Sequence, residues 1–297
     1  MLNRKIDDAA RLSNSNKFNF MTEFNAKNYW ETRLRDNFGL HGVGCIGWGP
    51  YYNNWLYKIR RIVFLHLVKF IESDITSADV LDIGSGSGFY IDRWREVAAK
   101  TITGADLTSI AVQELRNKYP SDAFHQIDIG DEVSALRGQQ FDIVSCFDVL
   151  FHIVDDNKYQ KAIENIYSLL KPGGYFAFSD VLLHGETRRY KHVVWRSQRE
   201  VQNSLQQAGF KVIREHPMFV LMNEPVNSNN RALGFFWRTT KRVIIKFKPA
   251  GLLVGGLLFP IERVLVTRLT QTSSTKVFLC RKPLEPDNSL PRQAISR

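Results

Sequence analysis

Three glycines and one aspartate form the most informative pattern in the chain. In VLDIGSGSGFY, residues 80–90, an apolar run of strand length leads through Gly84, Gly86 and Gly88 into a helical stretch. Glycine permits a tight turn and lets backbone N–H groups approach a ligand, and the helix N-terminus adds a partial positive charge. Asp106 follows at the end of the next apolar run, where a carboxylate can accept hydrogen bonds from two ribose hydroxyls. The pattern therefore predicts a nucleoside site.

The spacing of the glycines distinguishes between classes of nucleotide-binding site. A dinucleotide site needs G-x-G-x-x-G or A, but position 89, where the third small residue would stand, is Phe. A P-loop would need Gly-Lys followed by Ser or Thr, which is missing after the loop. A pyrophosphate site and a P-loop are both disfavoured.

These residues require a sheet that brings strand ends together. From residue 79 onward, apolar runs of strand length alternate with helical stretches, which predicts a parallel sheet covered on both faces. The expected strands are 80–84, 101–106, 124–128, 141–148, 174–180, 210–221 and 274–281. The expected helices are 25–37, 53–72, 88–100, 109–119, 157–171 and 197–207, the last opened by Ser197 and Glu200 at capping-box spacing.

With this pattern, the chain resembles the class I S-adenosylmethionine-dependent methyltransferases over about residues 79–181. The segments that carry the resemblance are Asp82-x-Gly84-x-Gly86-x-Gly88, Asp106, HQIDI with Asp128, FDIVSCFDVLFHI and LKPGGYFAFSD. The resemblance implies an α/β fold: a Rossmann-like, seven-stranded, mostly parallel sheet with helices on both faces and the last strand antiparallel. N-terminal helices and a C-terminal helical insertion are additions to this plan.

The resemblance also implies how the cofactor, S-adenosyl-L-methionine, is held. The methionine part should lie against Asp82 and the loop of Gly84, Ser85, Gly86 and Gly88. Asp106 should bind the ribose, with Leu107 against the adenine. Asp128 should take the adenine amino group and Ile129 pack on the ring, while Phe147 should offer its carbonyl to the methionine ammonium. As an alternative, Asp82 and Asp128 cap local turns.

A general base is needed only if the acceptor loses a proton in the reaction. For a hydroxyl acceptor, histidine is best matched to neutral pH. His152, in DVLFHI, is the first candidate, and His184 the second, with Asp180 in a position to orient either. A histidine beside an apolar segment is also often structural. Cys146 lies inside an apolar run and is disfavoured as a nucleophile.

Charge is unevenly distributed along the chain. Residues 181–297 carry 20 Lys and Arg against 7 Asp and Glu, so with a net charge of +10 the first 180 residues are net negative. An anionic partner is one interpretation and a solvated basic face is the other. The candidate basic residues are Arg188, Arg189, Lys191, Arg238, Lys241, Arg242, Lys246 and Lys248.

About fifty residues between the last two strands exceed an ordinary connection. This insertion combines FFWRTTKRVIIKFK with GLLVGGLLF, which favours a membrane surface over nucleic acid, because a nucleic acid gives leucines nothing to bury against. Its uncharged stretch, residues 249–261, is shorter than the ~20 residues of a spanning helix. The insertion, and the aromatic loop of Trp48, Tyr51, Tyr52 and Trp55, are expected to reach over the carboxyl edge of the sheet, although packing on the core is an alternative for the aromatics.

We expect a flexible terminus (1–20), an N-terminal helical cap (21–75), the methyltransferase core (76–222 and 274–283), a lid insertion (223–273) and a flexible tail (284–297). Three scattered Cys predict no disulfide framework or metal site and favour the cytoplasm, with the membrane periphery as an extension. The polar start does not resemble a signal peptide. The expected function is O-methylation of a small-molecule, glycan-type or lipid-linked acceptor. The alternatives are a nicotinamide-dependent reductase and a non-catalytic partner subunit that binds the cofactor.

Overall fold

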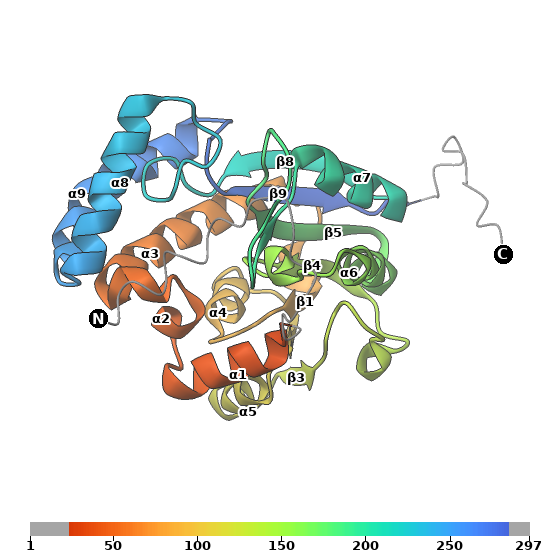
Figure 1. Ribbon diagram of the computed structural model, residues 1–297. Helices are drawn as coiled ribbons and strands as arrows, with labels where there is room; N and C mark the ends of the chain where they lie inside the picture. The colour runs from red at the N-terminus through yellow and green to blue at the C-terminus, as the bar shows by residue number, and fades with distance from the viewer. Residues whose placement is uncertain (1–23, 285–297) are drawn as a thin grey trace, which may run out of the picture.

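The computed structural model describes residues 24–284, and its centre is one seven-stranded sheet in the order β3-β2-β1-β4-β5-β9-β8 (Figure 1). The strands are β1 Asp79–Ile83, β2 Thr101–Asp106, β3 Ala123–Gln126, β4 Phe141–Cys146, β5 Leu170–Asp180, β8 Lys211–Pro217 and β9 Lys276–Arg281. β9 runs antiparallel between β5 and β8, whereas the pairs among β1 to β5 are parallel. The expected Rossmann-like fold class is confirmed.

Helices cover both faces of the sheet. The helices on one face are α3 Gly49–Leu67, α4 Phe89–Glu96 and α5 Ser109–Lys118, and those on the other are α6 Asp156–Leu169 and α7 Gln198–Ala208. Successive strand residues point to opposite faces, so Val80 belongs to one hydrophobic core and its neighbour Leu81 to the other. Both side chains are fully buried. Burial on both faces explains the apolar runs of the central strands β1 and β4, whereas the edge strands β3 and β8 contain polar residues.

Most element boundaries agree with the sequence prediction. The capping box of Ser197 and Glu200 is present at the start of α7. β5 begins at Leu170, four residues before the expected strand, because Leu170 already pairs with Phe141 of β4. β8 ends at Pro217, four residues earlier than expected. A short antiparallel pair, β6 Arg188–Arg189 and β7 Val194–Trp195, was not expected at all.

Additional helices lie at both ends of the chain. They are α1 Ala26–Asp36 and α2 Leu40–Val43 before the core, and α8 Arg231–Lys246 and α9 Ala250–Arg268 in the insertion. α8 and α9 lie together at one edge of the molecule, and α9 packs along α3 (Figure 1). The approach is close, since a Cβ added to Gly255 of α9 would lie 2.2 Å from the Trp55 ring of α3. The expected flexible segment 1–20 and almost all of the tail 284–297 lie outside the described residues.

Candidate active site

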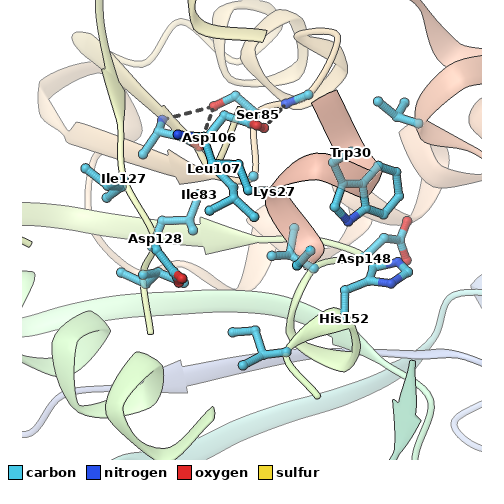
Figure 2. Close-up of a pocket in the computed structure, with 18 of the residues that line it drawn as sticks. Lys27, Trp30, Ile83, Ser85, Asp106, Leu107, Ile127, Asp128, Asp148 and His152 are labelled. Carbon is cyan, nitrogen blue, oxygen red and sulfur yellow. Dashed lines mark hydrogen bonds between the residues drawn. The ribbon is translucent and has the colours of Figure 1, made fainter. Parts of the chain in front are cut away.

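A cavity of about 700 Å³ lies at the carboxyl ends of β1, β2 and β4 (Figure 2). This volume is within the ~300–1,000 Å³ typical of small-molecule pockets. The lining comes from the glycine loop, the end of β2, the residues after β3, residues 147–155 after β4, and α1. Ligands of open α/β sheets bind at this edge, because the strand ends and the loops that follow them converge there.

Gly84 and Gly86 line the cavity and cannot be replaced without strain. Their φ angles are 72° and 51°, in the region that residues with a Cβ rarely adopt. A Cβ on Gly84 would lie 2.2 Å from Cγ2 of Val149, and one on Gly86 would lie 2.9 Å from Cγ1 of Val43. Any other residue would therefore strain the loop at these two positions.

Asp106 also lines the cavity and is tied to the glycine loop. Its Oδ2 accepts a hydrogen bond from the N–H of Gly86 at 2.9 Å, and its Oδ1 accepts from the N–H and the hydroxyl of Thr108 at 2.9 and 2.7 Å. Burial raises the pKa of Asp106, while these donors act in the opposite direction. The carboxylate is fixed in orientation, and lone pairs remain for a ligand hydroxyl.

Asp82 and Gly88 were expected to touch the cofactor, but neither is among the described residues that line the cavity. Asp82 is buried: its Oδ1 accepts from the hydroxyl of Ser145 at 2.6 Å and its carbonyl from the hydroxyl of Ser85 at 2.8 Å. Burial raises the pKa of Asp82 to about 7. Gly88, with φ 84°, caps α4, and a Cβ there would lie 2.8 Å from Leu115. Both residues therefore support the shape of the glycine loop without lining the cavity.

The other expected cofactor residues do line the cavity, and they are Ser85, Leu107, Asp128, Ile129 and Phe147. Asp128 accepts from the N–H of Gly130 at 2.9 Å and from Nζ of Lys158 at 3.0 Å, so it caps its own turn and also faces the cavity. Phe147 stacks on Tyr90 with ring centroids 4.2 Å apart. Their contacts with the cofactor stay predictions.

His152 lies in the cavity wall, on the single 3-10 turn Leu150–His152 that follows β4 (Figure 2). Its Nδ1 is 3.0 Å from the carbonyl oxygen of His192, in the turn between β6 and β7. A carbonyl only accepts, so Nδ1 carries the proton and Nε2 of the neutral ring is left as an acceptor. Burial lowers the pKa of His152 to about 4, so the ring is neutral at physiological pH. The Trp30 ring packs edge-on against it, with centroids 4.9 Å apart.

His184, the second candidate base, lies outside this cavity. It lines a separate, open surface hollow, and its backbone N–H donates to Oδ1 of Asn227 at 3.0 Å. Asp180, expected to orient either histidine, is buried and accepts from the N–H of Val181 at 2.7 Å. His184 is therefore not brought together with His152, and its role as a base stays a prediction.

Asp148 is a site residue that the sequence analysis missed. It has a φ angle of 59°, which is uncommon for a residue with a side chain. Its Oδ2 accepts from Nε of Arg60 at 2.7 Å, and its Oδ1 accepts from the hydroxyl of Ser179 at 3.0 Å. The carboxylate lies beside the His152 ring in the cavity (Figure 2). The sequence feature that could have indicated Asp148 is its position, two residues after the end of β4.

Helix α1, which belongs to the expected N-terminal helical cap (21–75), covers the cavity. Phe24, Lys27 and Trp30 contribute to the lining. The helix is fastened by Glu31, whose Oε1 accepts from the N–H and the hydroxyl of Ser109 at 2.6 and 2.8 Å. Ser109 begins α5, where the helix N-terminus favours a carboxylate.

The segments that were expected to cover the cavity do not. Within residues 24–284, no residue of the 223–273 insertion lines it, nor do Trp48, Tyr51, Tyr52 or Trp55. Instead, the hydroxyl of Tyr52 donates to the carbonyl of Met222 at 2.9 Å, and Nε1 of Trp55 donates to the carbonyl of Leu252 at 3.0 Å. Trp55 therefore fastens α3 to the insertion and Tyr52 fastens it to the residue just before the insertion, so the expectation that these segments cover the cavity is corrected.

Comparison with known families identifies the fold and its chemistry. Residues 55–215, more than half of the chain, match the family described as a methyltransferase domain. The chain is a class I S-adenosylmethionine-dependent methyltransferase. The methyltransferase keeps the glycine loop and the β2 acid at the cavity wall, as the resemblance implied.

Several known proteins are similar to this methyltransferase. The ubiquinone biosynthesis O-methyltransferase of Coxiella burnetii is 29% identical over 140 residues, which cover 43% of this chain and 57% of that protein. The tRNA U34 carboxymethyltransferase of Nautilia profundicola is 28% identical over 144 residues, 46% of each chain. The chain thus spans about half the length of these curated relatives.

Solved structures share the fold. The magnesium protoporphyrin IX methyltransferase of Synechocystis PCC 6803, with bound SAM, has a TM-score of 0.53 at 13% identity, covering 89% of this chain and 100% of its own. An N-methyltransferase of Bradyrhizobium japonicum WM9, in complex with S-adenosyl-L-homocysteine, has a TM-score of 0.51 at 14% identity, covering 87% and 99%.

The cavity of the methyltransferase suits its cofactor, S-adenosyl-L-methionine. Asp106 offers a fixed carboxylate for ribose hydroxyls, and Leu107 and Ile129 give apolar walls for a purine ring. Beside the carboxylate, Gly84 and Gly86 line the cavity with backbone atoms alone. The residues present therefore fit an adenosyl group.

Proposed function

We propose that this methyltransferase methylates an oxygen atom of a small-molecule acceptor, of glycan or lipid-linked type. The observation that carries the proposal is His152, which lies in the cavity wall with Nδ1 bonded to a carbonyl and Nε2 free to accept. The similarity to an O-methyltransferase, at 29% identity, supports the oxygen acceptor. When bound, the cofactor supplies an electrophilic methyl group on sulfonium.

His152 is proposed as the general base. A hydroxyl acceptor would give its proton to Nε2 as the oxygen–carbon bond forms and the bond from that carbon to the sulfonium sulfur breaks, which would leave a neutral thioether. The hydrogen bond from Nδ1 to the His192 carbonyl would keep the ring in place. Asp148 lies close enough to raise the pKa of His152 against the effect of burial. The carboxylate would therefore stabilise the imidazolium that forms.

Two alternative functions are a nicotinamide-dependent reductase and a non-catalytic subunit. Membership in the methyltransferase family removes the support for a nicotinamide-dependent reductase, and Phe89 interrupts the dinucleotide spacing. A non-catalytic subunit that binds the cofactor would keep the cavity but form no methylated product.

We propose a cytoplasmic location at the membrane periphery. In support, Cys45, Cys146 and Cys280 are all free thiols, as a reducing compartment requires. The insertion supplies the surface that would face the membrane.

The experiment is to incubate cell extract with the protein and a methyl-labelled cofactor, and then to find the labelled product by mass spectrometry. The proposal expects a methyl ether or ester that forms with the wild type and about 100-fold more slowly with His152→Gln. A product methylated on nitrogen would contradict the oxygen acceptor. No product, together with intact binding of S-adenosyl-L-homocysteine, would indicate the non-catalytic alternative.

A further inference from the structure

The outward sides of α8 and α9 expose many large apolar side chains. Leu253 and Leu257 of α9 are 71% and 75% exposed, and Phe235 and Phe247 of the α8 segment are 64% and 63% exposed. The other large apolar side chains exposed on these two helices and at their ends are Phe236, Val243, Ile245, Leu252, Ile261, Val264 and Leu269, and we term the whole set the α8–α9 face. Soluble monomers rarely expose so many apolar side chains together without a partner.

Helix α9 has two distinct sides. Its buried residues are Gly251, Gly255, Glu262 and Val266. Leu253, Leu257, Ile261 and Val264 follow one another at spacings of four, four and three residues, which places them on one side of a helix. The buried side is occupied by α3, so the leucine side is the one without a partner among the described residues.

α9 is also the one helix within residues 24–284 that is long and apolar enough to cross a membrane. Its packing argues against crossing. The carboxylate of Glu262 is buried and accepts from the N–H groups of Val220 and Leu221 at 2.7 and 2.8 Å. Withdrawing α9 from the domain would leave these groups and the Trp55 contact without partners. The helix therefore stays on the domain and presents only one side outward.

The charge of this region identifies the chemistry of its partner. Residues 231–268 contain eight Lys and Arg, and their one acid, Glu262, is buried. Within the described residues, Lys241 pairs with Glu224 and Lys248 bonds a backbone carbonyl. The basic residues that have no ion pair there are Arg231, Arg238, Arg242, Lys246, Arg263 and Arg268. Apolar side chains among unpaired cations are typical of helices that bind anionic lipid surfaces.

We propose that the α8–α9 face docks on an anionic lipid bilayer, with both helices lying along the surface. Leucine and phenylalanine side chains enter the boundary between headgroups and acyl chains, and the arginines and lysines contact lipid phosphates. The inference rests on the proposed membrane-peripheral location and names the surface responsible. It is independent of methyl transfer, because the α8–α9 face contributes no lining residue to the cavity among residues 24–284.

Co-sedimentation at low salt tests the proposal, with vesicles of phosphatidylglycerol and phosphatidylcholine and with vesicles of phosphatidylcholine alone. The wild type should bind the anionic vesicles and remain mostly free with the neutral ones. Leu253→Glu/Leu257→Glu should weaken binding at least tenfold, whereas Ile213→Glu, at a residue of β8 that is 42% exposed, should not. Arg238→Glu/Arg242→Glu should remove the preference for anionic vesicles, with Lys211→Glu as its control. Equal binding by wild type and both double variants, or none by the wild type, overturns the proposal.

A fluorescent probe separates the bilayer from other occupants. A polarity-sensitive dye on Leu257→Cys, in a Cys45→Ser background, should emit as in water in buffer and shift to the blue with anionic vesicles. A blue-shifted emission in buffer alone would mean that a second copy or a terminal segment covers the face, and it would overturn the proposal. Binding of S-adenosyl-L-homocysteine by every variant shows that the core is folded, so a failure here is distinct from a failure of the proposed function.

Discussion

The carboxylate of Asp106 accepts a hydrogen bond from the backbone N–H of Gly86 at 2.9 Å. This contact joins the end of β2 to the glycine loop after β1, at the wall of the cavity. Thr108 holds the second carboxylate oxygen through two hydrogen bonds. One residue therefore orders the loop and also presents a fixed acceptor to the ribose.

Replacing Asp106 should weaken cofactor binding. Asp106→Ala removes the charged acceptor and leaves the Gly86 N–H without its partner, at a cost of ~1–3 kcal/mol, or roughly a 5- to 150-fold loss of affinity. Titration calorimetry with S-adenosyl-L-homocysteine measures the effect. Glu132→Ala, at a side chain that is 85% exposed, is the control and should bind as the wild type does. Equal affinity in both variants would argue against the ribose role.

Gly84→Ala should damage both the loop and the binding. The added Cβ would lie 2.2 Å from Val149 at a φ of 72°, so overpacking of ~1–3 kcal/mol adds to backbone strain. Gly138→Ala is the matched control, because its φ of 79° is similar but nothing lies within 4 Å of the new Cβ. Thermal unfolding should therefore show a larger loss for Gly84→Ala. Val149→Ala should restore part of it, and equal losses in the two glycine variants would show that the contact with Val149 is unimportant.

His152→Gln should slow turnover about 100-fold while leaving cofactor affinity unchanged, because it removes the proton acceptor from the cavity wall. His184→Gln serves as the control, since His184 lies in a separate surface hollow. Both variants are compared by product formation and by calorimetry. Unchanged turnover in His152→Gln would exclude His152 as the base.

The pH dependence of turnover should reflect the burial of His152. Burial lowers the pKa of His152 to about 4, and a base must be unprotonated, so activity is lost only as the pH falls through that value. An exposed histidine would instead lose activity near its ordinary pKa of ~6.5. The catalytic efficiency kcat/KM, measured from pH 8 to pH 4, should therefore remain constant down to about pH 5 if His152 is the base. An acid limb near pH 6.5 that disappears in His152→Gln would contradict it.

The titration of Asp82 must be distinguished from that of His152 when the pH dependence of kcat/KM is measured. Burial raises the pKa of Asp82 to about 7, so this carboxyl also changes charge within the range studied. Asp82 loses its proton as the pH rises through about 7 and His152 loses its proton as the pH rises through about 4, so the two titrations have the same direction and differ in the pH at which they occur. A change in the rate near pH 7 that persists in His152→Gln is therefore assigned to Asp82 or another buried carboxyl and not to the base.

The local pattern predicted the fold and the centre of the site. Gly84, Gly86 and Asp106 lie together at the cavity because strand alternation dictates a parallel sheet, whose strand ends meet at one edge. His152 was predicted to lie at the same edge because it follows β4, and it does line the cavity. Asp82 has the type expected of a ligand contact, but its position inside β1 directs it to Ser145 of the neighbouring strand.

The position of α1 and the direction of the aromatic side chains near Trp55 depend on tertiary contacts. Nothing in the spacing of α1 shows that it covers the cavity, since this depends on Glu31 reaching Ser109, 78 residues later in the chain. Similarly, the aromatic residues near Trp55 face the insertion because Gly255 of α9 leaves room for the indole ring. Such pairings between distant segments leave no periodic signal in the sequence.

A crystal structure of the protein with S-adenosyl-L-homocysteine would show directly whether Asp106 and the glycine loop bind the cofactor. The ribose hydroxyls should lie on the carboxylate of Asp106, the amino-acid part beside Gly84 and Gly86, and the sulfur on the side of the cavity that His152 faces. A nucleoside bound elsewhere, or a cavity that remains empty at saturating ligand, would contradict this binding mode.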